Sequence, residues 1–210
     1  MKISKHLHSC LLVEDGGKAV LIDPGMYTVQ AKALDLNSIE KLDYVLYTHS
    51  HFDHFDAPFL KELVAKFPSV KVVATQDTVD QVKKEGIEVE ITTEGNEDIE
   101  VKECTHETIL NITVPNVLFH IFGKLTHPGD SLQFTESKEV LALPITAPWG
   151  HMQQAVEKAL EVKPKVAIPI HDFHWKDDAR QTLEGFAAQY LKANGGPELR
   201  MLETGEVYED

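Results

Sequence analysis

Four side chains that can bind metal fall within six residues, and this cluster constrains the chain more than any other feature. They are His49, His51, Asp53 and His54, in the segment Thr48-His49-Ser50-His51-Phe52-Asp53-His54. The apolar residues 43–47 before them predict a short strand, and a tight loop leaving that strand can bring all four groups to one point. Imidazole nitrogen and carboxylate oxygen suit zinc, iron or manganese better than calcium or magnesium. The segment therefore predicts a metal site.

Composition limits the partners of this site. The chain has 210 residues, 42% hydrophobic and 26% charged, which is typical of one soluble globular domain, expected here over residues 1–210. A net charge of −14 argues against nucleic acid and against an anionic membrane as partners, because both would be repelled. We therefore expect a small-molecule substrate, and leave a homo-oligomer open.

The cysteines and the N-terminus bear on location. Cys10 and Cys104 are the two cysteines, too few for a disulfide framework, so reduced thiols are expected. Residues 1–8 lack the apolar run of a signal peptide, and no window approaches the roughly 20 apolar residues of a membrane span. The expected location is cytoplasmic.

Periodicity predicts alternating strands and helices. Apolar runs at 9–14 and 18–23 flank Asp15-Gly16-Gly17, the signature of a β-hairpin. Further strands are expected at 70–74, 140–144 and 165–170, and helices at 57–67, 76–85, 152–161 and 179–193. Residues 88–94 and 98–103 alternate as two strands joined by a polar turn at 95–96. This order favours helices layered on sheets.

The segment at residues 48–54 resembles the T-H-x-H-x-D-H signature of the metallo-β-lactamase-fold hydrolase superfamily. Three later elements resemble the same superfamily in its order: His106 after a strand, Gly129-Asp130, and Pro169-Ile170-His171. The resemblance spans residues 9–174. The short chain and its Gly-Asp and Pro-Ile-His elements are similar to the branch that contains ascorbate-phosphate lactonase-like proteins.

The resemblance implies an α+β fold, a four-layer αβ/βα sandwich with two mixed sheets flanked by helices. It also implies two divalent ions, with zinc expected first and manganese or iron as alternatives. Their ligands would be His49, His51 and His106 for one ion, Asp53, His54 and His171 for the other, and Asp130 shared by both. Residue chemistry alone says only that all seven can bind. Asp23, by itself an ordinary turn residue, would lie behind the site and hydrogen-bond a ligand histidine.

The implied activity is hydrolysis of a small ester, lactone or phosphoester by a bridging hydroxide that the ions activate. Asp53 would carry a proton to the leaving group. No Ser/His/Asp constellation or glycine-rich phosphate loop points to a covalent route. A mono-iron dioxygenase of the same fold and a non-catalytic metal-binding protein are the alternatives.

Three residues near the ends of later strands are candidates for substrate binding. Trp149 and His151 follow the strand at 140–144, and His174 follows the strand that leads to His171. An indole can pack a ring-shaped ligand, although Trp149 could equally fill the seam between a helix and a sheet. His120 is expected in the core, and His127 in a supporting or structural role.

Overall fold

The computed structural model describes residues 1–210, which divide into two compact units. The first unit comprises residues 1–96 and 203–210, and the second residues 97–202. Each unit has its own sheet and its own hydrophobic core. The expectation of a single domain stays a prediction. None of the helices combines the length and the apolar character that crossing a membrane requires.

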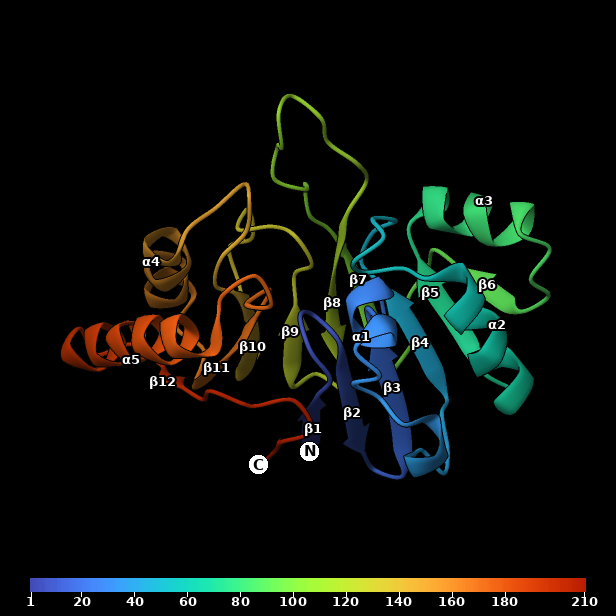
Figure 1. Cartoon of the computed structure of the whole chain (residues 1–210), viewed down its shortest axis with the longest axis horizontal. Helices are drawn as coiled ribbons and strands as arrows, with labels where there is room; N and C mark the ends of the chain where they lie inside the picture. The colour runs from blue at the N-terminus through green and yellow to red at the C-terminus, as the bar shows by residue number, and fades with distance from the viewer. The chain divides into compact units, whose positions relative to one another are not determined.

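The first unit is built on a seven-stranded mixed sheet of order β13-β1-β2-β3-β4-β5-β6 (Figure 1). Its strands are β1 (Lys2–Lys5), β2 (Leu11–Asp15), β3 (Lys18–Ile22), β4 (Tyr44–Tyr47), β5 (Lys71–Ala74), β6 (Glu90–Thr92) and β13 (Val207–Glu209). β2 and β3 form the predicted antiparallel hairpin, while β3 to β6 run parallel. The carboxyl ends of β3, β4 and β5 therefore share one edge, and the histidine motif leaves β4 there.

Helices α2 (Ala57–Lys66) and α3 (Gln76–Lys84) of the first unit follow the predicted spacing. The unit also contains α1 (Met26–Gln30) and a 3₁₀ turn at Leu36–Ser38, which the sequence analysis did not predict. The Asp56 carboxylate caps α2 by accepting the Phe59 N–H at 2.8 Å, and this satisfies a donor that has no partner inside the helix. α2 buries Phe59, Leu60 and Leu63 in the core of the unit. The cap fixes where α2 begins, three residues after His54.

The second unit is built on a six-stranded sheet of order β12-β11-β10-β9-β8-β7. Its strands are β7 (Ile99–Glu103), β8 (Val117–Ile121), β9 (Leu125–His127), β10 (Val140–Pro144), β11 (Val166–Ile170) and β12 (Glu198–Leu199). β7 to β9 are antiparallel and β9 to β12 are parallel. Helices α4 (Met152–Val162) and α5 (Asp177–Ala193) lie together beside β10–β12 (Figure 1). Both sheets are thus mixed and flanked by helices, as predicted.

The expected turn between residues 88–94 and 98–103 is wrong, although both strands exist. β6 pairs in parallel with β5 in the first sheet, whereas β7 pairs antiparallel with β8 in the second. Ile91 packs against the core of the first unit, and Ile99 is fully buried in the second. The polar residues between them cross from one sheet to the other. Alternation indicates a strand, but it does not indicate which partner the strand will pair with.

Gly25 allows the metal-motif loop to pack closely against the chain after β3. A Cβ atom at Gly25 would lie 2.0 Å from the carbonyl oxygen of Asp53. The N–H of Met26 donates to the carbonyl oxygen of Phe52 at 2.7 Å and fastens the same loop. Because only glycine leaves room for this approach, Gly25 sets the position of residues 52–54.

We expect Gly25→Ala to lower the free energy of unfolding by at least about 1–3 kcal/mol, since the added methyl group overlaps main-chain atoms. Gly185→Ala on α5 is the matched control, because nothing lies within 4 Å of its added Cβ. That control should be neutral or stabilising by up to about 1 kcal/mol. Urea unfolding measures both, and equal midpoints for the two variants would contradict the close approach.

Candidate metal centre

The buried carboxylate of Asp23 lies directly behind the histidine motif. It accepts the Thr48 N–H at 2.8 Å on Oδ1 and the Thr48 hydroxyl at 2.7 Å on Oδ2. Nδ1 of His54 lies 2.7 Å from Oδ2. Because an ionised carboxylate can only accept, Nδ1 of His54 carries the proton, and Nε2 carries the lone pair that a metal needs.

His49 is oriented by the same network through Thr48. The Thr48 hydroxyl gives its hydrogen to Asp23, so it can accept a hydrogen bond from Nδ1 of His49 at 3.1 Å. His49 therefore also presents Nε2 as the coordinating nitrogen. Its ring centroid lies 4.8 Å from that of His51 and 4.0 Å from that of His54. One carboxylate thus sets the tautomers of two motif histidines.

The candidate ligands of the first unit form two groups. The ligand atoms of His49 and His51 lie within 4.8 Å of each other, and so do those of Asp53, His54 and a further residue, His8. Nε2 of His8 is 3.2 Å from Oδ2 of Asp53. His8 was not among the residues that the sequence pointed to. It stands alone in a turn far from the motif in sequence, and only the folded chain reveals it.

The second unit gathers His106, Asp130 and His171. Nε2 of His171 lies 3.1 Å from Oδ1 of Asp130, and Nε2 of His106 lies 3.6 Å from Oδ2. Nδ1 of His171 donates to the Thr146 carbonyl oxygen at 2.9 Å, and Nδ1 of His106 contacts the Glu107 carbonyl oxygen. Each carboxylate oxygen thus faces a different imidazole, the arrangement that a carboxylate shared by two ions requires.

Asn116, a residue that the sequence did not single out, holds the two loops that carry His106 and Asp130. Its side-chain amide donates to the carbonyl oxygens of Cys104 and Pro128, both at 3.0 Å. Its Oδ1 accepts the N–H of Asp130 at 3.3 Å. An isolated asparagine before a strand gives no sequence signal of this role.

The substrate candidates occupy different environments. Trp149 donates its indole N–H to Oδ2 of Asp130 at 2.9 Å, so its polar end is directed at a candidate ligand. His151 is exposed at the N-terminus of α4, where its main-chain N–H donates to Oε1 of Gln154 at 3.1 Å. His174 is exposed, with its ring centroid 6.4 Å from that of His171.

The two remaining histidines of this unit are buried. Nδ1 of His120 lies 2.9 Å from Oγ1 of Thr126 across β8 and β9. His127 accepts the N–H of Gly129 at 3.4 Å, and so supports the turn before Asp130.

These residues have the donor atoms that a transition-metal ion needs, and most of them are buried. Four imidazoles, those of His49, His54, His106 and His171, are held through Nδ1 by a carboxylate, a hydroxyl or a main-chain carbonyl. Histidines that bind metal usually use their second nitrogen in this way, which fixes the tautomer and the ring orientation. Nitrogen donors combined with carboxylate oxygens suit zinc, manganese or iron.

The cysteines take no part in this chemistry. Cys10 and Cys104 are both free and buried. Burial raises the pKa of both thiols, so each stays protonated near neutral pH and is a poor nucleophile and a poor ligand.

The pKa of the Tyr27 hydroxyl is also raised, first by burial and further by the negative charge of Asp53.

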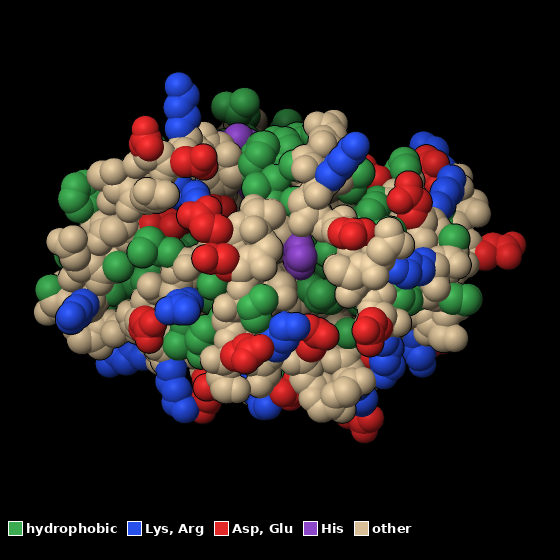
Figure 2. Space-filling model, turned by 60° about the horizontal axis from the view of Figure 1, so that its bottom comes forward, with side chains coloured by type: hydrophobic (Ala, Val, Ile, Leu, Met, Phe, Trp, Pro, Cys, Tyr) green, Lys and Arg blue, Asp and Glu red, His purple; other side chains and the backbone are tan.

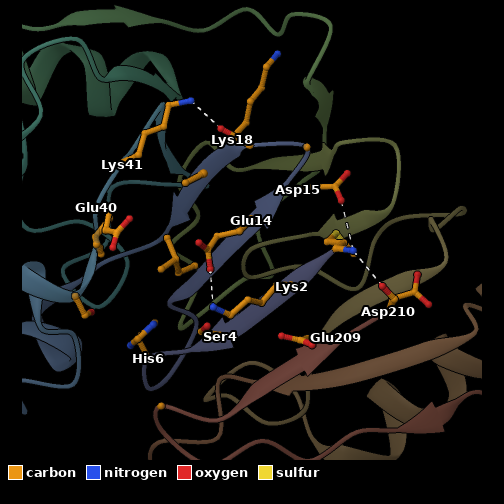
Figure 3. Close-up of a pocket in the computed structure, with 18 residues that line it drawn as sticks. Lys2, Ser4, His6, Glu14, Asp15, Lys18, Glu40, Lys41, Glu209 and Asp210 are labelled. Carbon is orange, nitrogen blue, oxygen red and sulfur yellow. Dashed lines mark hydrogen bonds and ion pairs between the residues drawn. The ribbon is translucent and has the colours of Figure 1, made fainter.

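A groove of the first unit is lined by residues outside the motif. It has a volume of about 830 Å³ and is lined partly by β1, β2 and β3 (Figure 3). Two ion pairs lie in its lining, Lys2 with Glu14 at 3.1 Å and the N-terminal ammonium with Asp15 at 3.4 Å, and Lys41 donates to the Gly17 carbonyl oxygen at 2.8 Å. Figure 2 shows acidic and basic side chains mixed over one face, without a continuous basic patch. Neither this groove nor this charged face contains a group of metal-binding side chains like those of the motif, so we take the histidine clusters as the candidate catalytic site.

Known proteins share this sequence pattern and fold. Residues 2–171 match the family described as the beta-lactamase superfamily domain, and the chain belongs to this family. It is 30% identical over 186 residues to UPF0173 protein PF0020 of Pyrococcus furiosus, covering 81% of this chain and 83% of that protein. It is 25% identical over 236 residues to the UPF0173 metal-dependent hydrolase ABC2731 of Shouchella clausii, covering 100% of both.

The fold is that of the metallo-β-lactamases. The crystal structure of YhfI from Bacillus subtilis, a metallo-beta-lactamase fold protein, matches with a TM-score of 0.72 and 18% identity, covering 100% of this chain and 99% of that one. The superfamily expected from the motif is confirmed. The similarity to ascorbate-phosphate lactonase-like proteins stays a prediction.

Replacing Asp23 by asparagine should weaken zinc binding about 10–100-fold. The new amide N–H₂ would face Nδ1 of His54 and make it an acceptor, so the proton would move to Nε2 and block coordination. Zinc affinity is measured by competition with a chromophoric chelator. The exposed Asp80→Asn removes the same charge as a control, and equal affinities for both variants would contradict the role of Asp23.

Proposed function

We propose that this protein is a metal-dependent hydrolase whose two divalent ions share Asp130. One observation carries the proposal: the two oxygens of Asp130 face the Nε2 atoms of two different histidines, His106 and His171. Membership of the superfamily supports it. So does the relative from Shouchella clausii, which matches this chain over its full length and is named a metal-dependent hydrolase.

The proposed ligands follow the order of the superfamily along the chain. They are His49, His51 and His106 for the first ion, Asp53, His54 and His171 for the second, and Asp130 for both. The two groups within the first unit support this division, because His49 lies with His51 and Asp53 lies with His54. Zinc is proposed first, with manganese or iron as alternatives.

The bound ions would lower the pKa of a water molecule and so supply a hydroxide nucleophile at neutral pH. The protein's own residues hold the rest of the site in place. Asp23 keeps Nε2 of His54 free of a proton, and the Thr146 carbonyl does the same for His171. Asp53, the residue before the last one of the motif, would pass a proton to the leaving group as general acid.

A groove of the second unit supports a small, uncharged substrate. It has a volume of about 260 Å³ and is lined by Glu107, Leu132, Gln133, Trp149, Gln154, Glu157, Lys158 and Glu161. Three carboxylates stand there against one ammonium group, and Lys158 already pairs with Glu161 at 2.6 Å. Because this lining repels anions, we propose an ester or a lactone ahead of a phosphoester.

Protein purified without chelators should contain about two zinc or manganese ions per chain and should hydrolyse neutral lactones or esters faster than phosphodiesters. Elemental analysis counts the ions, and a panel of lactones, esters, thioesters and phosphodiesters tests the activity. His54→Ala should lower both the metal content and the hydrolysis, because it removes a ligand.

Two other results would contradict the proposed two-ion hydrolase. One iron per chain without hydrolysis would support the mono-iron dioxygenase. Unchanged metal content and unchanged hydrolysis in His54→Ala would refute the two-ion hydrolase.

Trp149→Phe separates the two roles of the indole, since it keeps an aromatic face and removes only the N–H donor. If the bond to Asp130 matters most, kcat and zinc affinity fall about 10-fold while KM stays close to wild type. The half-buried Trp175→Phe, at a tryptophan packed against the core of the same unit, is the control. A rise in KM alone would instead assign Trp149 to substrate packing.

A further inference from the structure

His8 lies in the short turn between β1 and β2 and is almost fully buried, with 1% of its surface exposed. Its Nε2 is 3.2 Å from Oδ2 of Asp53, across 45 residues of sequence. Its ring meets those of Tyr27 and His54 edge-on, with centroids 5.2 and 5.4 Å away. The ring is therefore held between two aromatic neighbours, with Nε2 directed at the carboxylate.

The turn that carries His8 has a costly backbone conformation. Leu7 and His8 both have positive φ angles, +76° and +51°, in the left-handed region that residues other than glycine rarely adopt. The main-chain bonds from His6 N–H to the Cys10 carbonyl, at 2.8 Å, and from Cys10 N–H to the Leu7 carbonyl, at 3.0 Å, close the turn. Such strain, about 1–3 kcal/mol per residue, is commonly found at functional sites.

We propose that His8 is a positioning residue for the metal centre, donating its Nε2–H to Oδ2 of Asp53 and thereby orienting this carboxylate. The inference rests on the proposed function, in which Asp53 is a ligand of the second ion. An ionised carboxylate only accepts hydrogen bonds, so Nε2 of His8 must be the donor. The same Oδ2 lies 3.9 Å from Nε2 of His54, so the hydrogen bond from His8 sets the position of a carboxylate oxygen beside that ligand nitrogen.

His8 acts on the ion through Asp53 and is not itself a ligand. The proposed second ion already has four protein ligands in Asp53, His54, Asp130 and His171. Partners that orient a ligand typically change metal affinity 10–100-fold when they are removed. His8 should therefore affect the second ion much more than the first.

The test compares two substitutions at His8. His8→Gln places an amide N–H₂ close to the position of Nε2 and keeps the donor, whereas His8→Phe keeps a ring and removes the donor. Metal-free protein is titrated stepwise with zinc in a calorimeter, and the heats of binding give the affinity for each ion. His8→Phe should bind the second ion about 10–100-fold more weakly, and His8→Gln should stay within about threefold of wild type.

His6→Asn is the matched control in the same turn. His6 is also buried, but its Nδ1 bonds to the Ala33 carbonyl oxygen at 3.0 Å, and asparagine can keep that donor. This variant should bind both ions like wild type. Thermal unfolding of all the variants in chelator checks that His8→Phe is folded. A second control repeats His8→Phe in the Asp53→Ala variant. Because His8 is proposed to act through Asp53, His8→Phe should have no further effect on zinc affinity there.

The outcomes are distinguishable. Unchanged affinity for the second ion in folded His8→Phe overturns the positioning role. Equal losses in His8→Gln and His8→Phe overturn it in favour of direct coordination by His8. If wild-type protein itself does not bind two ions, the proposed function fails first, whatever the variants do.

Discussion

The ligand-bearing edge of the first unit depends on the buried carboxylate of Asp23. A buried charge is costly unless it is fully hydrogen-bonded, and Asp23 meets that condition with two donors from Thr48 and one from His54. The same bonds join the end of β3 to the start of the motif after β4. Burial of one charged group therefore fixes both the path of the loop and the proton positions of His49 and His54.

The second unit orients its histidines by different means. His106 and His171 are held by main-chain carbonyls, which are neutral acceptors, and the amide of Asn116 fixes the loops around Asp130. A carboxylate partner raises the basicity of a ligand histidine more than a carbonyl does. Of these three histidines, His54 has a charged partner on Nδ1, whereas His106 and His171 depend on main-chain geometry.

Three residues at or beside the candidate ligands have a strained backbone. His8, Asp23 and His171 all have positive φ angles, +51°, +46° and +66°, although none is glycine. Two of them, Asp23 and His171, directly follow strands of their sheets, and His8 stands in the turn after β1. Strained residues persist only where the surrounding structure over-determines them. The ends of β3 and β11 supply that support for Asp23 and His171.

Local spacing in the sequence was enough to predict the superfamily, most helices and strands, and the motif that supplies four of the seven proposed ligands. Only the tertiary structure placed β6 and β7 in different sheets, brought His8 to Asp53 and directed the Trp149 N–H at Asp130. Each of these is a pairing between residues that are distant in sequence, or a choice among possible strand partners. Periodicity shows which face of an element is buried, whereas the partner across that face is decided only when the chain has folded.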